Sequence, residues 1–121
     1  MTLLDTDVLI EILKGREKAL QKVRDFDQCA VSAVSAMELI FGAKNKAEVE
    51  EIENALSELT FFYITKQISV TALSLMQSYS KSHGLAIPDA LIAATAIQED
   101  VRLYTLNVRD FRFISELRLV T

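Results

Sequence analysis

Short apolar runs alternate with amphipathic stretches along almost the whole chain, and this alternation limits the possible folds more than any other feature. The runs at 3–4, 29–31, 61–64 and 103–106 are too short for surface helices and predict buried strands, with a short last strand at 117–120. Strands that alternate with helices across short turns indicate a parallel sheet covered on both faces. We therefore predict an α/β fold, built as a single domain over residues 1–121.

Helical spacing between these runs predicts six helices. The first begins at Thr6 or Asp7, since either side chain can cap it, and ends before Gly15. The others are expected over 17–26, from Ser32 or Ser35 to 41, and over 46–59, 67–82 and 88–97. Proline suits the first turn of the last one, because its missing backbone N–H would have no partner there.

Composition excludes several classes of protein. A chain of 121 residues, 50% hydrophobic and 25% charged, can bury one core and is not disordered. The single cysteine, Cys29, excludes an internal disulfide and a cysteine-based zinc cluster, and is interpreted as a small core residue.

No apolar run approaches the roughly 18 residues that span a membrane, and no leader peptide is evident, so we expect a cytoplasmic protein. A net charge of −4 argues against coating nucleic acid by bulk attraction.

Four carboxylates occupy positions that suggest a shared site. Asp5 directly follows the first strand, and Asp110 follows the fourth. Asp89 opens the last helix, and Glu38 lies inside an apolar helix, where an unpaired carboxylate would be costly to bury. The carboxyl ends of parallel strands meet at one edge of a sheet, so these side chains are expected to converge.

Crowded carboxylates repel one another unless cations join them, and oxygen ligands in this number suit Mg²⁺ or Mn²⁺. Such an ion can activate water to hydrolyse a phosphodiester. No protein nucleophile competes, since Cys29 is expected in the core and His83, the only histidine, at a surface helix end. Each acid also has an ordinary alternative: Asp89 suits a helix N-terminus, Asp5 a turn, and Asp110 or Glu38 the surface.

Four segments carry a family resemblance: LLDTDVLI at 3–10, SAVSAMEL at 32–39, IPDALIAATA at 87–96 and YTLNVRDF at 104–111. Together they resemble the PIN-domain ribonucleases, and in particular the small VapC-type toxins of prokaryotic toxin–antitoxin pairs. The resemblance implies a three-layer α/β/α sandwich with a short parallel sheet. It also implies a metal-dependent endoribonuclease whose acidic pocket holds one or two Mg²⁺ or Mn²⁺ ions.

By that match, Asp5, Glu38 and Asp89 fall on the three family acids. The fourth family acid matches either Asn107, a neutral amide, or Asp110, which keeps the charge. Thr6 and Thr105 match positions where the family often has hydroxyls that hold water or phosphate. Asp7 matches a variable polar position and is expected to hydrogen-bond the site. Candidates for RNA contact are Lys14, Arg16, Lys44, Lys46, Arg109 and Arg112, of which Arg109 and Arg112 flank Asp110.

The resemblance further implies a cognate antitoxin lying across the pocket, and a homodimer. Two alternatives remain open. The chain could be a PIN-like binding module without catalysis, or a phosphoacceptor switch, because Asn107 departs from the acidic pattern. It could also be a phosphatase of the haloacid-dehalogenase type, with Asp5 as nucleophile and Asp7 as general acid, although Val8 and Leu9 stand where that family has Gly or Thr.

Overall fold

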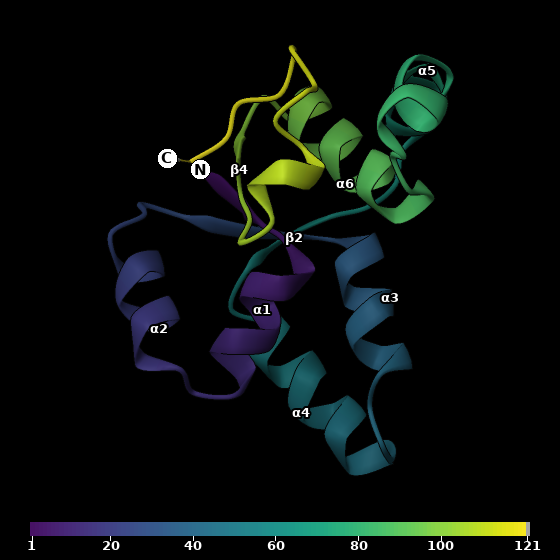
Figure 1. Ribbon diagram of the computed structural model, residues 1–121. Helices are drawn as coiled ribbons and strands as arrows, with labels where there is room; N and C mark the ends of the chain where they lie inside the picture. The colour runs from purple at the N-terminus through teal and green to yellow at the C-terminus, as the bar shows by residue number, and fades with distance from the viewer. Residues whose placement is uncertain (121) are drawn as a thin grey trace.

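A computed structural model of the chain describes residues 1–120 and contains one parallel sheet (Figure 1). Its strands are β1 (Thr2–Leu4), β2 (Cys29–Ser32), β3 (Thr60–Phe62) and β4 (Arg102–Tyr104), in the order β3-β2-β1-β4. Leu3 of β1 pairs with Ala30 on one side and with Leu103 on the other. The first strand along the chain is therefore central, which places the residue after it at the middle of the carboxyl edge.

Six α-helices and a short 3₁₀ helix connect and flank the strands. They are α1 (Thr6–Leu13), α2 (Glu17–Arg24), α3 (Ala33–Phe41), α4 (Lys46–Leu56), α5 (Lys66–His83), α6 (Ile87–Gln98) and η1 (Val108–Asp110). The predicted cap of α1 was wrong, because Asp5 rather than Thr6 or Asp7 caps it. Ser32 caps α3, one of the two residues predicted for that role.

The sheet has a separate apolar core on each face, as expected for three layers. Successive strand residues point to opposite sides, so Leu3 and Leu4 enter different cores. Leu3 packs with α5, α6 and the segment after β4, whereas Leu4 packs with α1, α3 and α4. Figure 1 shows α5 and α6 on one side of the strands and α1, α2 and α4 on the other. The α/β/α sandwich predicted from the sequence is confirmed.

Two strands end before the apolar runs that predicted them. β3 stops at Phe62 because Tyr63 and Ile64 are exposed and lead to Thr65, the cap of α5. β4 stops at Tyr104 because the next residues bind the carboxylates at the sheet edge, as described below. The predicted strand at 117–120 is reduced to one bridge between Leu119 and Leu103.

Three smaller expectations can be compared with the structure. Cys29 is half-buried and packs against the core that contains Leu4. His83 ends α5 on the surface, as predicted, with its ring stacked on Phe113 at 4.4 Å between centroids. Within residues 1–120, no helix is both long and apolar enough to cross a bilayer.

Candidate active site

Asp5 stands at the carboxyl edge of β1, in the middle of the sheet. Its Oδ1 accepts a hydrogen bond of 2.8 Å from the backbone N–H of Thr6, and its Oδ2 accepts one of 2.7 Å from the Thr105 hydroxyl. Only 6% of the residue is exposed. The start of α1 and the residue after β4 therefore fix this carboxylate together.

Burial raises the pKa of Asp5 to about 6. The hydrogen bonds from Thr105 and Thr6 oppose the increase, while the charges of Asp7 and Asp89 add to it. Hydrogen-bond donors therefore hold the Asp5 carboxylate in place, while nearby carboxylates repel its charge. A cation beside it would favour the ionised form.

Asp7 ties the first turn of α1 to the loop after β4. Its Oδ2 accepts hydrogen bonds from the backbone N–H of Leu106 at 3.1 Å and from the side-chain amide of Asn107 at 3.0 Å. The backbone N–H of Asn107 in turn donates to the Thr105 hydroxyl at 3.0 Å. The other oxygen of Asp7, Oδ1, is buried without a partner among the described residues. Asp7 and Asn107 therefore set the position of this loop.

This arrangement bears on the phosphatase alternative. A general acid has to present an oxygen to its substrate. In Asp7, one oxygen is occupied by the loop and the other is buried. The geometry thus does not favour the role that a haloacid-dehalogenase-type mechanism would give to Asp7.

Glu38 reaches the site from α3. The expectation from the sequence that its carboxylate is buried was wrong. The residue is exposed rather than buried, because its apolar neighbours Met37 and Phe41 are themselves on the surface. Its Oε1 accepts a hydrogen bond of 2.7 Å from the Thr6 hydroxyl, which also lies 2.8 Å from Ser35 Oγ. The first turn of α1 thus positions Glu38 as well as Asp5.

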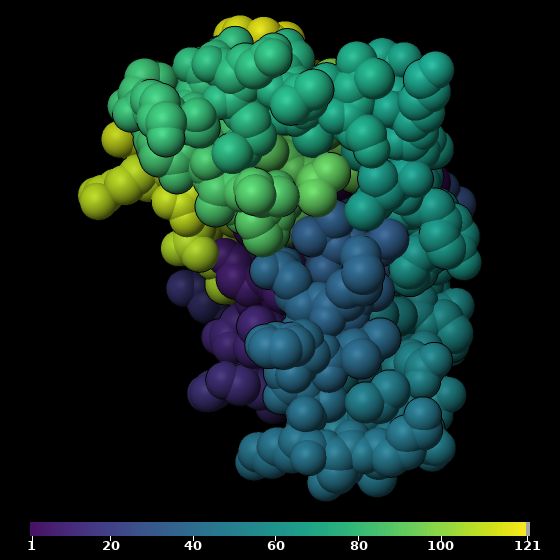
Figure 2. Space-filling model, turned by 90° about the vertical axis from the view of Figure 1, so that its right-hand side faces the viewer, coloured from purple at the N-terminus to yellow at the C-terminus, as the bar shows by residue number. Residues whose placement is uncertain are grey.

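The exposed apolar side chains around Glu38 line a groove of about 380 Å³ between α3 and α6. Figure 2 shows α3, in blue, meeting α6, in green, on this face of the molecule. The groove is lined by Val34, Met37, Glu38, Phe41, Ile64, Ile87, Pro88 and Leu91. Glu38 is therefore the polar residue at the end of an otherwise apolar surface.

Asp89 lies in the first turn of α6, one residue after Pro88. Burial raises its pKa to about 6, and the charges of Asp110, Glu38 and Asp7 raise it further. The four predicted acids are therefore close enough to interact electrostatically, with Asp110 contributing the largest charge effect on Asp89. Asp110 itself is exposed and ends η1.

The acids form an open cluster rather than a closed metal cage. Among residues 1–120, no three His, Cys, Asp or Glu side chains converge closely enough to enclose an ion as they stand. The donor set nevertheless suits a hard divalent cation, because it consists of carboxylate oxygens whose ionised forms repel one another. Asp5 is fixed, whereas Glu38 and Asp110 are exposed and have room to move.

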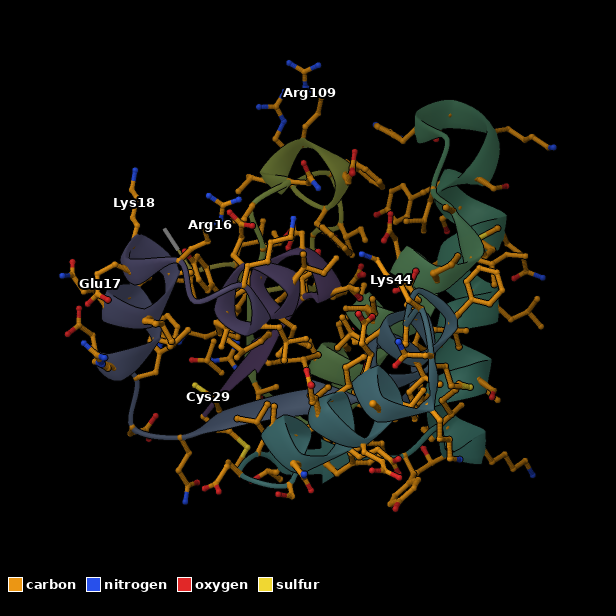
Figure 3. The ribbon with its side chains drawn as sticks, turned by 90° about the horizontal axis from the view of Figure 1, so that it is seen from below. Arg16, Glu17, Lys18, Cys29, Lys44 and Arg109 are labelled. Atoms are coloured by element: carbon orange, nitrogen blue, oxygen red, sulfur yellow. The ribbon has the colours of Figure 1, made fainter. Side chains whose placement is uncertain are left out.

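The predicted substrate-binding residues fall into two groups. Thr6 and Thr105 lie within the site and donate hydrogen bonds to its carboxylates. Arg109 and Arg112 are exposed, and Figure 3 shows Arg109 extending outward from the body of the protein. The arginines are therefore available to a ligand outside the pocket, while the threonines position acids inside it.

The sequence analysis missed one residue that the structure places beside the site. Ser35 was expected only as a helix start, yet it contacts Thr6 beside Glu38. Its position one turn before Glu38, on an otherwise apolar helix, was the signal that could have identified it. Asp7 was expected to hydrogen-bond the site, and it does so through the loop that carries Asn107.

The comparisons with known proteins agree with this architecture. The PIN domain family profile matches residues 2–116. Ribonuclease VapC10 from Mycobacterium tuberculosis is 38% identical over 122 residues, which cover 98% of this chain and 91% of that protein. Ribonuclease VapC19 from the same organism is 31% identical over 123 residues, covering 98% of each chain.

Two solved structures also match this chain over nearly its whole length. A toxin–antitoxin complex from Klebsiella pneumoniae contains a chain that is 33% identical, with a TM-score of 0.85 and coverage of 100% of this chain and 97% of that one. VapBC2 from Rickettsia felis, solved with a DNA fragment from its promoter, has 25% identity and a TM-score of 0.81 over 98% and 96% of the two chains.

Proposed function

Since the chain belongs to the PIN-domain family, we propose that it is an endoribonuclease, the toxin of a toxin–antitoxin pair, which uses metal-activated water. The observation that carries the proposal is the crowding of carboxylates at the carboxyl edge of the sheet, where the charges of Asp110, Glu38 and Asp7 raise the pKa of Asp89. Curated relatives named ribonucleases support the reaction class, and the neighbouring complexes support a protein partner.

Asp5, Glu38, Asp89 and Asp110 are the residues that would hold Mg²⁺ or Mn²⁺. When bound, such an ion lowers the pKa of its water and neutralises charge on the phosphate oxygens. Asp5 would serve as the fixed ligand because Thr105 and Thr6 hold its two oxygens in place. We assign the fourth position to Asp110 rather than Asn107, because Asp110 carries a charge that acts on Asp89, whereas the amide oxygen of Asn107 is a neutral ligand.

The chain also supplies groups for proton transfer and substrate contact. A carboxylate of this cluster, such as Asp89, would also accept the proton of the attacking water. Attack forms a new bond from the water oxygen to phosphorus, and the bond from phosphorus to the leaving ribose oxygen breaks. Arg109 and Arg112, exposed beside Asp110, are placed to contact phosphates of the bound RNA.

The test is cleavage of a pool of structured RNAs by the purified protein with Mg²⁺, with Mn²⁺ and with EDTA. Asp5→Asn and Asp89→Asn should each abolish metal-dependent cleavage while the fold is retained. Glu53→Gln, on the exposed face of α4, is the matched carboxylate control and should cleave like the wild type. No cleavage with either metal, in the absence of an antitoxin, would favour the alternative of a binding module without catalysis.

The partner proposals need separate measurements. Co-expression with the neighbouring gene product should yield a complex that no longer cleaves RNA, if that product is the antitoxin. The expected homodimer remains a prediction, which sedimentation of the purified chain will test. Failure of either experiment would leave the nuclease proposal intact.

A further inference from the structure

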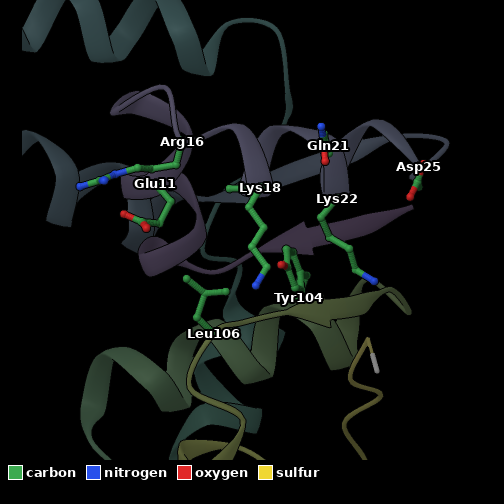
Figure 4. Close-up of a pocket in the computed structure, with 9 residues that line it drawn as sticks. Glu11, Arg16, Lys18, Gln21, Lys22, Asp25, Tyr104 and Leu106 are labelled. Carbon is green, nitrogen blue, oxygen red and sulfur yellow. The ribbon is translucent and has the colours of Figure 1, made fainter.

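A second concave surface, of about 580 Å³, lies between α2 and the end of β4 (Figure 4). Its rim carries three cations, Arg16, Lys18 and Lys22, and two carboxylates, Glu11 and Asp25. None of these three cations forms an ion pair within residues 1–120, where Arg24 of the same helix is already paired with Glu17. The pocket is thus positive at its rim, in a chain whose net charge is −4.

An aromatic ring lies between the two lysines of this pocket. Figure 4 shows Lys18 and Lys22 extending from α2 toward Tyr104, one on either side of its ring. Phe26 and Tyr104 form a T-shaped pair with centroids 5.6 Å apart, and Arg102 lies over the Phe26 ring at 5.5 Å. These contacts hold the Tyr104 ring in place, which suits a ring on which a flat ligand stacks.

Three successive residues connect the pocket to the acidic site. Tyr104 lines the pocket, Thr105 donates to Asp5, and Leu106 donates its backbone N–H to Asp7 while its side chain lines the pocket. Leu106 is half exposed, at 51%, and lies between the pocket and the acids. Burial, and then the charge of Asp7, raise the pKa of Tyr104, so Asp7 lies within electrostatic reach of this ring.

We propose that this pocket binds the single-stranded RNA segment that flanks the cleaved phosphodiester, with a phosphate held by Lys18 and Lys22 and a base stacked on Tyr104. The inference rests on the proposed nuclease function and extends it to a second subsite. Unpaired cations around a partly exposed aromatic ring are the combination by which proteins hold single strands without reading their sequence. Figure 3 adds that Lys18 and Arg109 extend toward the same side of the molecule, so one strand can contact both.

The experiment measures binding rather than cleavage, so that it does not depend on a loaded metal site. Fluorescence anisotropy follows a labelled RNA of twelve uridines with the full chain in EDTA, over a range of KCl concentrations. In the double variant Lys18→Gln/Lys22→Gln, the Kd should rise and the slope of log Kd against log salt should fall by about 0.7, because the variant loses one phosphate contact on a single strand.

Tyr104→Leu provides a second test with a different signature. It should weaken binding by about tenfold at every salt concentration with no change in slope, while Tyr104→Phe should bind like the wild type. The matched control is Lys66→Gln/Lys81→Gln, which removes two exposed lysines from the distant α5. This control should leave the Kd within twofold of the wild type.

The outcomes separate this proposal from the nuclease proposal. Unchanged Kd and slope in Lys18→Gln/Lys22→Gln, or no RNA binding by the wild type, would overturn the subsite. Loss of antitoxin binding with unchanged RNA binding would also overturn it and assign the pocket to the protein partner. Lysine-dependent RNA binding by a chain that never cleaves RNA would support the subsite and overturn the proposed nuclease function.

Discussion

Asp5 and Asp89 are two carboxylates of one site whose pKa values are both raised to about 6, by different balances of forces. At Asp5, burial is opposed by hydrogen bonds from Thr105 and Thr6. At Asp89, burial and three neighbouring carboxylates all act in the same direction, and no hydrogen bond from residues 1–120 opposes them. Hydrogen bonds within the fold therefore stabilise the carboxylate of Asp5. The carboxylate of Asp89 has no such donor within residues 1–120 and is left available to a ligand.

The same contrast divides the whole site. We call Asp5, Asp7, Thr105 and Asn107 the anchored half, because hydrogen bonds join them across α1 and the loop after β4. We call Glu38, Asp89 and Asp110 the open half, since only Glu38 among them receives a side-chain hydrogen bond within the described residues. Residues of the anchored half should affect stability, and among them Asp5, as the fixed ligand, should affect catalysis and cation binding as well. Residues of the open half should affect catalysis and cation binding without a loss of stability.

The largest difference expected in the rate of RNA cleavage is between variants of Asp110 and Asn107. Asp110→Asn removes a charge from the open half and should lower the rate of RNA cleavage by about 100-fold or more. Asn107→Ala loses the hydrogen bond to Asp7 but no charge, and should lower the rate less than tenfold. Initial rates on one RNA decide this, and a reversed order would move the fourth ligand to Asn107.

A second prediction concerns stability. Asp5→Ala removes the cap of α1 and leaves the Thr105 hydroxyl without its acceptor, so the free energy of unfolding should fall by about 2 kcal/mol. Asp89→Ala should leave it unchanged or raise it, because only repulsion is removed. Urea denaturation of both variants in EDTA measures the difference. Equal losses would contradict the division into two halves.

Thr105→Val tests whether the Thr105 hydroxyl stabilises the anchored half. Valine has the shape of threonine but cannot donate to Asp5 or accept from the backbone of Asn107. We expect a loss of about 1 to 2 kcal/mol in unfolding free energy. Thr71→Val on α5, a half-buried threonine outside the site, is the control and should cost less. A loss no larger than that of the control would mean that Thr105 is not an anchor.

The smallest expected effect is a pH dependence. The pKa of Asp89 is raised from 3.8 to about 6 in the folded protein, so the folded state binds this proton more tightly than the unfolded state does. The resulting stabilisation is present at low pH and is lost as the pH rises through about 6. The half-buried position reduces its size to about 1 kcal/mol.

Asp89→Asn cannot titrate, so it should gain stability relative to the wild type between pH 4 and pH 7. Denaturation of the two proteins in parallel, in EDTA, isolates this difference from the titration of all other groups. A difference that stays constant with pH would show that the pKa of Asp89 is not raised.

The sequence predicted the parts of this molecule that depend on local pattern. Apolar runs and helical spacing identified the parallel sheet, and the position of Asp5 after the first strand located the edge at which the acids gather. The burial of Glu38 was predicted wrongly because an apolar helix face can also be exposed, as Phe41 is at 92%. The network from Asp7 to Asn107 could not be predicted, because it joins residues 100 apart.

The most direct test of the central claim is a calorimetric titration of Mn²⁺ into the metal-free protein at neutral pH. The wild type should bind the ion, and Asp5→Asn and Asp89→Asn should each weaken binding by at least about tenfold, because each removes a charged ligand. Glu53→Gln should bind like the wild type. Equal binding by the wild type and Asp89→Asn, or no binding by the wild type, would contradict the assignment of these carboxylates to a metal site.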